Sequence, residues 1–346
     1  GDATITDSDI SINQSNNGGG GIFNDGGTMK INKSTVASNE SLAANGGGIF
    51  NGIMSMLTLN TVEVINNKSL NGGAGLFNFT DTTATINDST FSGNESNNDG
   101  GAIFNHSRLA IDNTTIEDNK TLAHDGGALW NDLKGEVTIT NGTHFELNLA
   151  TRGDAIFNNG KVTVKDSFFV LNGAPNWGGA IGNTGSLTID NSSFTENSSN
   201  TGGALHNQAS GKVIIQNNSF LAKNKASDGA AISNRGEMTI DQSTLSKNTS
   251  AISGGAINNR SELFILRSTI NENKANDNGG GIFNAVGKTT ISTSTIGPNE
   301  AVNRGGGIYN DGGSVIVSRS SLKENTAGNG GGGIANFNGG TAAVSY

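Results

Sequence analysis

The sequence contains no cysteine, only two prolines and comparatively few apolar residues. Without cysteine, neither a disulfide framework nor a thiolate metal site can form. Apolar residues make up 33% of the 346 residues, below the average of globular proteins, and aromatic residues only 5%. A chain with so little apolar surface becomes ordered only when its apolar residues recur in a regular pattern.

Positive charge and long apolar runs are also scarce. The 21 Lys and Arg residues face 30 Asp and Glu residues, and the formal charge of −9 argues against a general electrostatic surface for nucleic acid. No stretch approaches the roughly 20 apolar residues of a membrane span, and no charged and apolar leader opens the chain. We therefore expect no nucleic acid partner and no membrane span in this segment.

Glycine is abundant, with 52 residues, and much of it lies in blocks such as Gly-Gly-Gly-Ile-Phe-Asn at 46–51 and 279–284. Successive blocks are separated by 24 to 27 residues, a period typical of solenoid proteins. A second anchor of the form Phe-x-x-Asn follows many blocks, as at Phe91 to Asn94. The last residue of the block is asparagine in thirteen repeats: Asn24, Asn51, Asn78, Asn105, Asn131, Asn158, Asn183, Asn207, Asn234, Asn259, Asn284, Asn310 and Asn336.

Each repeat holds three short segments in which apolar residues alternate with polar ones, separated by Gly, Asn, Asp and Ser turn signals. This pattern is typical of strands and not of helices. One repeat cannot bury its apolar side chains, but stacked repeats can, with their strands paired in parallel about 4.8 Å apart. We predict an all-β fold, a right-handed parallel β-helix of about 13 coils of 24–27 residues with three strands each, forming a single domain over 1–346.

The glycine block also predicts which side chains face inward. An aliphatic residue stands two positions before each of the thirteen asparagines, so both should point into the solenoid, and the preceding glycines permit a sharp corner. Stacked asparagine amides can hydrogen-bond to one another and to the turn backbone. We interpret these asparagines as a structural ladder, since thirteen identical copies suit a scaffold better than a binding site.

The position between the aliphatic residue and the asparagine should point outward. It is aromatic in six consecutive repeats: Phe23, Phe50, Phe77, Phe104, Trp130 and Phe157. An exposed aromatic stripe is a candidate binding surface for a partner, because aromatic faces stack on sugar rings or pack against another protein. The alternative is that the rings fold over the small Gly/Ala positions and seal the corner.

Blocks of Gly-Gly-Ala-Ile/Leu that alternate with Phe-x-x-Asn, here Gly101 to Ile103 with Phe91 to Asn94, resemble the repeats of chlamydial polymorphic membrane proteins. The segment 279–310 is similar to glycine-rich β-helical surface proteins of other bacteria. The resemblance implies a β-helical surface adhesin on the outer surface of a bacterium. It also implies a carbohydrate or a surface protein of a host or neighbouring cell as partner.

Parallel β-helices also include polysaccharide-degrading enzymes, which place aspartates on adjacent coils. The nearest match here is Asp99 and Asp125, each directly before Gly-Gly in neighbouring repeats, with Asp154 offset by one place. Two stacked carboxylates could bind Ca²⁺ or form an acid/base pair, or they could be ordinary turn aspartates. We expect no catalytic residue and no other cofactor. Four histidines occupy different places in the repeat and are predicted at the surface: His106, His124, His144 and His206.

Both chain ends fall within strand segments, near Ala3 and Val344. We therefore expect an excerpt of a longer chain, or one whose ends are capped by neighbours through head-to-tail or lateral self-association. The function that fits these features is a non-enzymatic secreted or cell-surface β-helix acting as adhesin or binding stalk. The alternatives are a self-assembling subunit of an extracellular fibre or sheath and, third, a polysaccharide-degrading enzyme.

Overall fold

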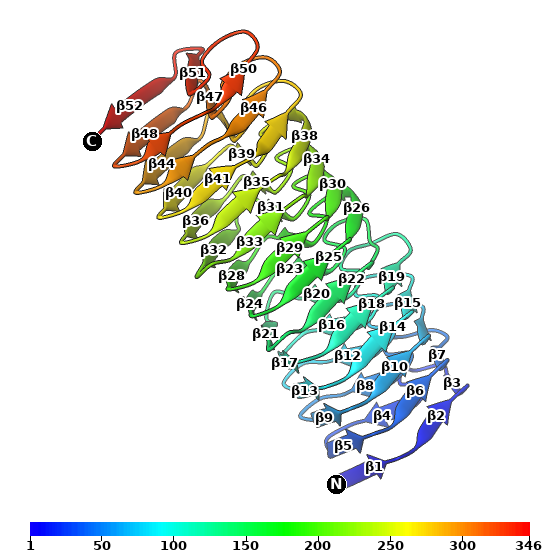
Figure 1. Cartoon of the computed structure of the whole chain (residues 1–346). Coiled ribbons are helices and arrows are strands. Elements are labelled where there is room, and N and C mark those ends of the chain that lie inside the picture. The colour runs from blue at the N-terminus through cyan, green and yellow to red at the C-terminus, as the bar shows by residue number, and fades with distance from the viewer. The chain divides into compact units, whose positions relative to one another are not determined.

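A computed structural model describes residues 1–346, which form β-strands and turns with no helix (Figure 1). Strands of successive repeats pair in parallel, so the predicted parallel β-solenoid of about 13 turns is confirmed. No helix is present that could cross a membrane. The chain divides into two compact units, Gly1–Gly173 and Ala174–Tyr346, which are described one by one. The single domain over 1–346 stays a prediction.

The first unit contains four parallel sheets. The first sheet holds β1 (Asp2–Thr6), β5 (Thr28–Asn32), β9 (Met56–Asn60), β13 (Thr83–Asn87), β17 (Arg108–Asp112), β21 (Glu136–Thr140) and β24 (Lys161–Lys165). The second holds β2 (Asp9–Ser11), β6 (Thr35–Ala37), β10 (Glu63–Ile65), β14 (Thr90–Ser92), β18 (Thr115–Glu117), β22 (His144–Glu146) and β25 (Phe168–Val170). The third holds β3 (Gln14–Ser15), β7 (Glu40–Ser41), β11 (Lys68–Ser69), β15 (Glu95–Ser96) and β19 (Lys120–Thr121). The fourth holds β4 (Ile22–Asn24), β8 (Ile49–Asn51), β12 (Leu76–Asn78), β16 (Ile103–Asn105), β20 (Leu129–Asn131) and β23 (Ile156–Asn158).

The second unit repeats this plan, and β26 (Gly173–Trp177) begins at the last residue of the first unit. Its first sheet holds β28 (Ser186–Asp190), β32 (Lys212–Gln216), β36 (Glu237–Asp241), β40 (Glu262–Leu266), β44 (Lys288–Ser292), β48 (Ser314–Ser318) and β52 (Thr341–Ser345). Its second holds β29 (Ser193–Thr195), β33 (Phe220–Ala222), β37 (Thr244–Ser246), β41 (Thr269–Asn271), β45 (Thr295–Ile296) and β49 (Ser321–Leu322). Its third holds β30 (Ser198–Thr201), β34 (Lys225–Asp228), β38 (Thr249–Ser253), β42 (Asn273–Ala275), β46 (Asn299–Ala301) and β50 (Thr326–Ala327). Its fourth holds β27 (Ile181–Asn183), β31 (Leu205–Asn207), β35 (Ile232–Asn234), β39 (Ile257–Asn259), β43 (Ile282–Ala285), β47 (Ile308–Asp311) and β51 (Ile334–Phe337).

Most turns therefore carry four strand segments and not the three expected from the sequence. The additional segment follows the second asparagine anchor, as in β7 and β11, where Glu40 and Ser41 pair with Lys68 and Ser69. It is only two residues long in the first unit and lacks an apolar alternation. Periodicity alone therefore gave no signal for it.

The core of each unit is a set of stacked, like side chains. Strand partners in neighbouring turns are in register, so that Ile86 of β13 lies beside Ile111 of β17 and Phe145 of β22 stacks on Phe169 of β25 with ring centroids 4.7 Å apart. These four side chains are fully buried. Burial of apolar surface contributes roughly 25 cal/mol per Å², so a narrow core gains stability by adding turns.

The glycine blocks form a corner where neighbouring backbones nearly touch. A Cβ on Gly101, the second glycine of its block, would lie 2.1 Å from the carbonyl oxygen of Gly127 in the next turn. A Cβ on Gly48, at the third position of its block, would lie 2.8 Å from the nearest carbonyl oxygen. Alanine occupies that third position naturally at Ala102. The approach at Gly101 is thus tighter than at Gly48, although other turns carry Ala74, Asp154 and Ala230 at the second position.

We expect Gly101→Ala to lower the free energy of unfolding by about 2 kcal/mol, because the added methyl group forces two backbones apart. Urea unfolding followed by circular dichroism measures the change, with Gly48→Ala as the matched control. Equal losses in the two variants would contradict the close approach described for Gly101.

Candidate functional site

The thirteen block asparagines form hydrogen-bonded ladders at one corner of each unit. In the first unit the Asn105 Nδ2 donates to Asn131 Oδ1 at 2.9 Å, and Asn131 Nδ2 donates to Asn158 Oδ1 at 2.9 Å. Asn131 also donates to the Gly135 carbonyl oxygen at 3.0 Å. In the second unit Asn207 donates to Asn234 in the same way. The predicted asparagine ladder is confirmed. Its inner amides are fully buried and hydrogen-bond to one another.

The second asparagine anchor forms another ladder, which the sequence analysis had only marked as a repeat. Asn119 of the first unit receives hydrogen bonds from the backbone and side-chain nitrogens of Asn94, at 3.0 and 2.9 Å. Its own Nδ2 donates to the Phe91 carbonyl oxygen at 2.9 Å and to Asn148 Oδ1 at 3.1 Å. This ladder holds the bend that follows the second sheet.

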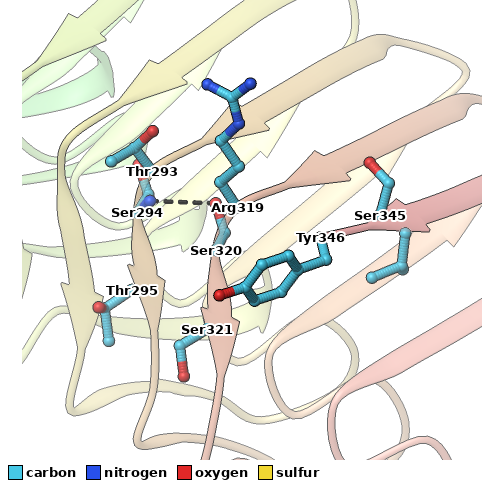
Figure 2. A pocket seen from close by; sticks show the side chains of 9 residues that line it. Thr293, Ser294, Thr295, Arg319, Ser320, Ser321, Ser345 and Tyr346 are labelled. Atoms are coloured by element: carbon cyan, nitrogen blue, oxygen red, sulfur yellow. Dashed lines mark hydrogen bonds between the residues drawn. The ribbon is translucent and has the colours of Figure 1, made fainter.

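Buried serine and threonine hydroxyls line a further corner, between the first and second sheets. The Ser89 hydroxyl, for example, accepts the Val62 N–H at 3.0 Å and donates to the Asn87 carbonyl oxygen at 2.7 Å. In the second unit the Ser294 N–H donates to the Ser320 hydroxyl at 3.0 Å (Figure 2). A pocket opens beside this pair, and its lining has no acidic or histidine side chain: Thr293, Ser294, Thr295, Arg319, Ser320, Ser321, Val344, Ser345 and Tyr346.

The aromatic residues from Phe23 to Phe157, here called the aromatic column, follow one another along the fourth sheet of the first unit, with three of the five successive ring pairs stacked and two tilted. The five successive ring-centroid distances are 4.9, 5.3, 5.1, 6.0 and 4.7 Å. Exposure varies along the column: Phe23 is 52% exposed, whereas Phe77 and Phe157 are each 3% exposed. Phe50, Phe104 and Trp130 are half-buried. The open part of the column therefore consists of Phe23 and these three rings.

Two neighbouring rings explain the burial of Phe77. The centroid of Phe79 lies 5.8 Å from that of Phe77, and His106 meets Phe77 edge-on at 5.5 Å. The His106 ring also lies 4.7 Å from Phe104, and its Nδ1 is 2.7 Å from an Asp132 carboxylate oxygen. Phe79 was not predicted to belong to this surface, although the alternation in Phe77-Asn78-Phe79 places both rings on the same face of the chain.

The rings also cover the glycine corner. A Cβ on Gly72 would lie 2.6 Å from Phe104, and one on Gly18 would lie 3.1 Å from Phe50. Both interpretations of the column are thus compatible with its geometry, because one side of a ring packs on glycine while the other side is open. Because Gly18 and Gly72 have no side chain, the Phe50 and Phe104 rings can pack directly on the backbone.

At three successive turns of the second unit the equivalent position is polar and nevertheless buried: His206, Ser233 and Asn258. His206 is 2% exposed, which makes its predicted place at the surface wrong, and its ring centroid lies 4.6 Å from that of Trp177, with the two rings tilted by 42°. Burial, ahead of the nearby Arg235 charge, lowers the pKa of His206 to about 3, so the ring is neutral. A short aromatic stack returns further along, with Phe283, Tyr309 and Phe337 at successive distances of 5.3 and 5.4 Å.

The candidate aspartates lie at the glycine corner. The Asp125 N–H donates to the Asp99 carboxylate at 3.1 Å, so the two residues are neighbours as predicted from the repeat. Both oxygens of the buried Asp125 carboxylate accept hydrogen bonds from Arg152, a partner that the sequence analysis did not assign. Burial raises the pKa of Asp99, helped by the Asp125 charge and opposed by the N–H that Asp125 donates.

This arrangement engages the carboxylate pair in a local network. A guanidinium that holds both Asp125 oxygens competes with a cation for them. No group of three or more His, Cys, Asp or Glu side chains in residues 1–346 is arranged so that it could hold a metal ion. Binding of Ca²⁺ by Asp99 and Asp125 and the expected lack of catalysis both stay predictions.

Asp154 stands at the second-glycine position of its block and is fully buried. Its Oδ1 accepts the Ala150 N–H at 2.7 Å, and its Oδ2 has no hydrogen-bond partner. Burial raises the pKa of Asp154 to about 8, against the lowering effect of the Ala150 and Gly173 backbone N–H groups. The buried site therefore stabilises the protonated, neutral form of the Asp154 carboxyl group over the carboxylate.

Fold, ladders and aromatic column together define a parallel β-solenoid repeat protein. A family model described as the Chlamydia polymorphic membrane protein (Chlamydia_PMP) repeat matches residues 88–106. This segment includes the Phe91 to Asn94 anchor and the block that begins at Gly100, so the resemblance seen in the sequence is confirmed for this repeat. Comparisons with curated proteins and with solved structures gave no match.

Proposed function

We propose that this chain is a non-enzymatic, surface-exposed binding stalk of a bacterium that acts as an adhesin. The observation that carries the proposal is the aromatic column, which presents Phe23, Phe50, Phe104 and Trp130 along one face of the first unit. Open aromatic faces favour sugar rings or an apolar protein surface as the partner. The match to a membrane protein repeat supports a surface location at the level of the family.

Attachment of purified protein to glycan arrays and to host or neighbouring cells tests this proposal. We expect Phe104→Ala with Trp130→Ala to weaken attachment by about tenfold, because aromatic residues dominate binding energy at such surfaces. Phe23→Ala, at the most exposed ring of the column, should weaken it less. Phe220→Ala, which removes an exposed ring outside the column, is the control.

Undiminished attachment by a folded double variant would refute the column as the contact. Sedimentation velocity on the same samples addresses the fibre or sheath alternative. Particles that lengthen with protein concentration would favour the structural subunit, whereas a monomer that attaches through the column would favour the adhesin.

A further inference from the structure

A second surface of the first unit is apolar, and the aromatic column does not include it. It lies on the outer side of the turns that contain β22 and β25 and is formed by Leu147, Leu149, Phe168 and Leu171, here called the leucine patch. These side chains are between 43% and 50% exposed. The Leu147 N–H donates to the Val170 carbonyl oxygen, so Leu147 and Leu171 occupy the same place in neighbouring turns.

Leu147 and Leu171 are in a strained backbone conformation. Their φ angles are +52° and +55°, in the left-handed region that disfavours bulky side chains. Other turns place Ser38, Asn66 or Gly93 at this column. Leucine at this position is unfavourable for the backbone and exposes apolar surface to solvent. Because other turns fold with Ser, Asn or Gly here, the fold does not require leucine, and we interpret the two leucines as contact residues.

The edge of the leucine patch carries uncompensated negative charge. At several other places charged residues in neighbouring turns pair with opposite signs, as Lys120 with Glu95 at 2.7 Å and Lys274 with Glu300 at 2.8 Å. At the patch, Glu117 instead lies in register with Glu146, and Asp118 follows Glu117. Glu117 and Asp118 have no ion-pair partner, and Glu146 has only His144, at 3.6 Å.

We propose that the leucine patch binds a cationic amphipathic polypeptide segment, whose apolar side chains contact the leucines and whose Lys or Arg side chains pair with Glu117, Asp118 and Glu146. Three of the four patch side chains are aliphatic, which favours an apolar peptide face over a sugar, since sugars stack on aromatic rings. The stacked carboxylates favour a basic partner, because unpaired like charges in neighbouring strands destabilise the free protein and gain from compensation.

A fluorescent amphipathic helical peptide of leucine and lysine serves as the probe, with a leucine and glutamate peptide of equal length as its counterpart. Binding to the full chain is followed by anisotropy. We expect the basic peptide to bind and its affinity to fall with added salt, since exposed charges are screened. Equal binding of the acidic peptide would overturn the proposal.

The variant Leu147→Asn with Leu171→Asn is expected to weaken peptide binding by about tenfold or more. Its fold should be retained, because asparagine tolerates the left-handed region and occurs at Asn66 of the same column. Ile12→Asn is the matched control, since Ile12 lies in this column with φ +58° and is exposed, but belongs to the first turn. Glu117→Gln with Glu146→Gln should reduce both affinity and salt dependence.

Unchanged peptide binding by the leucine double variant would overturn the proposal. Self-association of the chain that this variant abolishes would also overturn it, because the occupant would then be a second copy.

Discussion

Replacement of Asn119 by alanine is expected to lower the free energy of unfolding by at least about 3 kcal/mol. The substitution removes the acceptor of two hydrogen bonds from Asn94 and the donor of bonds to the Phe91 carbonyl oxygen and to Asn148. All of these groups are buried, so each loses its hydrogen-bond partner at a place remote from solvent. The damage affects three turns, because a ladder residue serves the turns on both sides.

The urea midpoint and the slope of the unfolding transition measure this effect. Asn97→Ala is the matched control from the preceding turn, because the Asn97 side chain is exposed and makes no hydrogen bond in the structure. It should change the free energy of unfolding by less than about 0.5 kcal/mol. A similar midpoint for both variants would show that the ladder contributes little to stability.

The second large effect concerns pH. The pKa of the Asp154 carboxyl is raised by burial to about 8, above the ordinary value of 3.8 that applies to the unfolded chain. Below about pH 4 both states are protonated and the contribution to stability is complete. Between about pH 4 and pH 8 only the unfolded state loses the proton, so stability falls as pH rises, by about 1.4 kcal/mol per unit at most.

Asp154→Asn is therefore expected to stabilise the protein by a few kcal/mol at pH 7 and to converge with the parent chain near pH 4. Thermal unfolding between pH 4 and pH 8 measures both curves. A shallower slope should remain in the variant, because burial also raises the pKa of Asp99. Asp81→Asn, at an exposed turn, is the control and should leave the slope unchanged. Parallel curves for the parent and Asp154→Asn would contradict the assignment.

Much of the candidate site could be predicted because every repeat has the same order of glycine, aliphatic, outward-facing and asparagine positions. Successive side chains of a strand alternate between its two faces, so Ile103 and Asn105 face inward and Phe104 faces outward. The asparagine ladder and the aromatic column could therefore be predicted from the sequence. The burial of Phe77 did not follow, because it depends on the Phe79 and His106 rings that lie outside the repeat pattern.

The sequence by itself determined the solenoid, its period and its asparagine ladder. Thirteen copies of one pattern average out local exceptions, and parallel stacking transmits the register from turn to turn. The tertiary structure alone decided the exceptions: the Arg152 partner of Asp125, the burial of Asp154 and His206, and the strained leucines beside unpaired carboxylates. Each of these depends on what the neighbouring turn places within a few ångströms, and a single repeat carries no information about that neighbour.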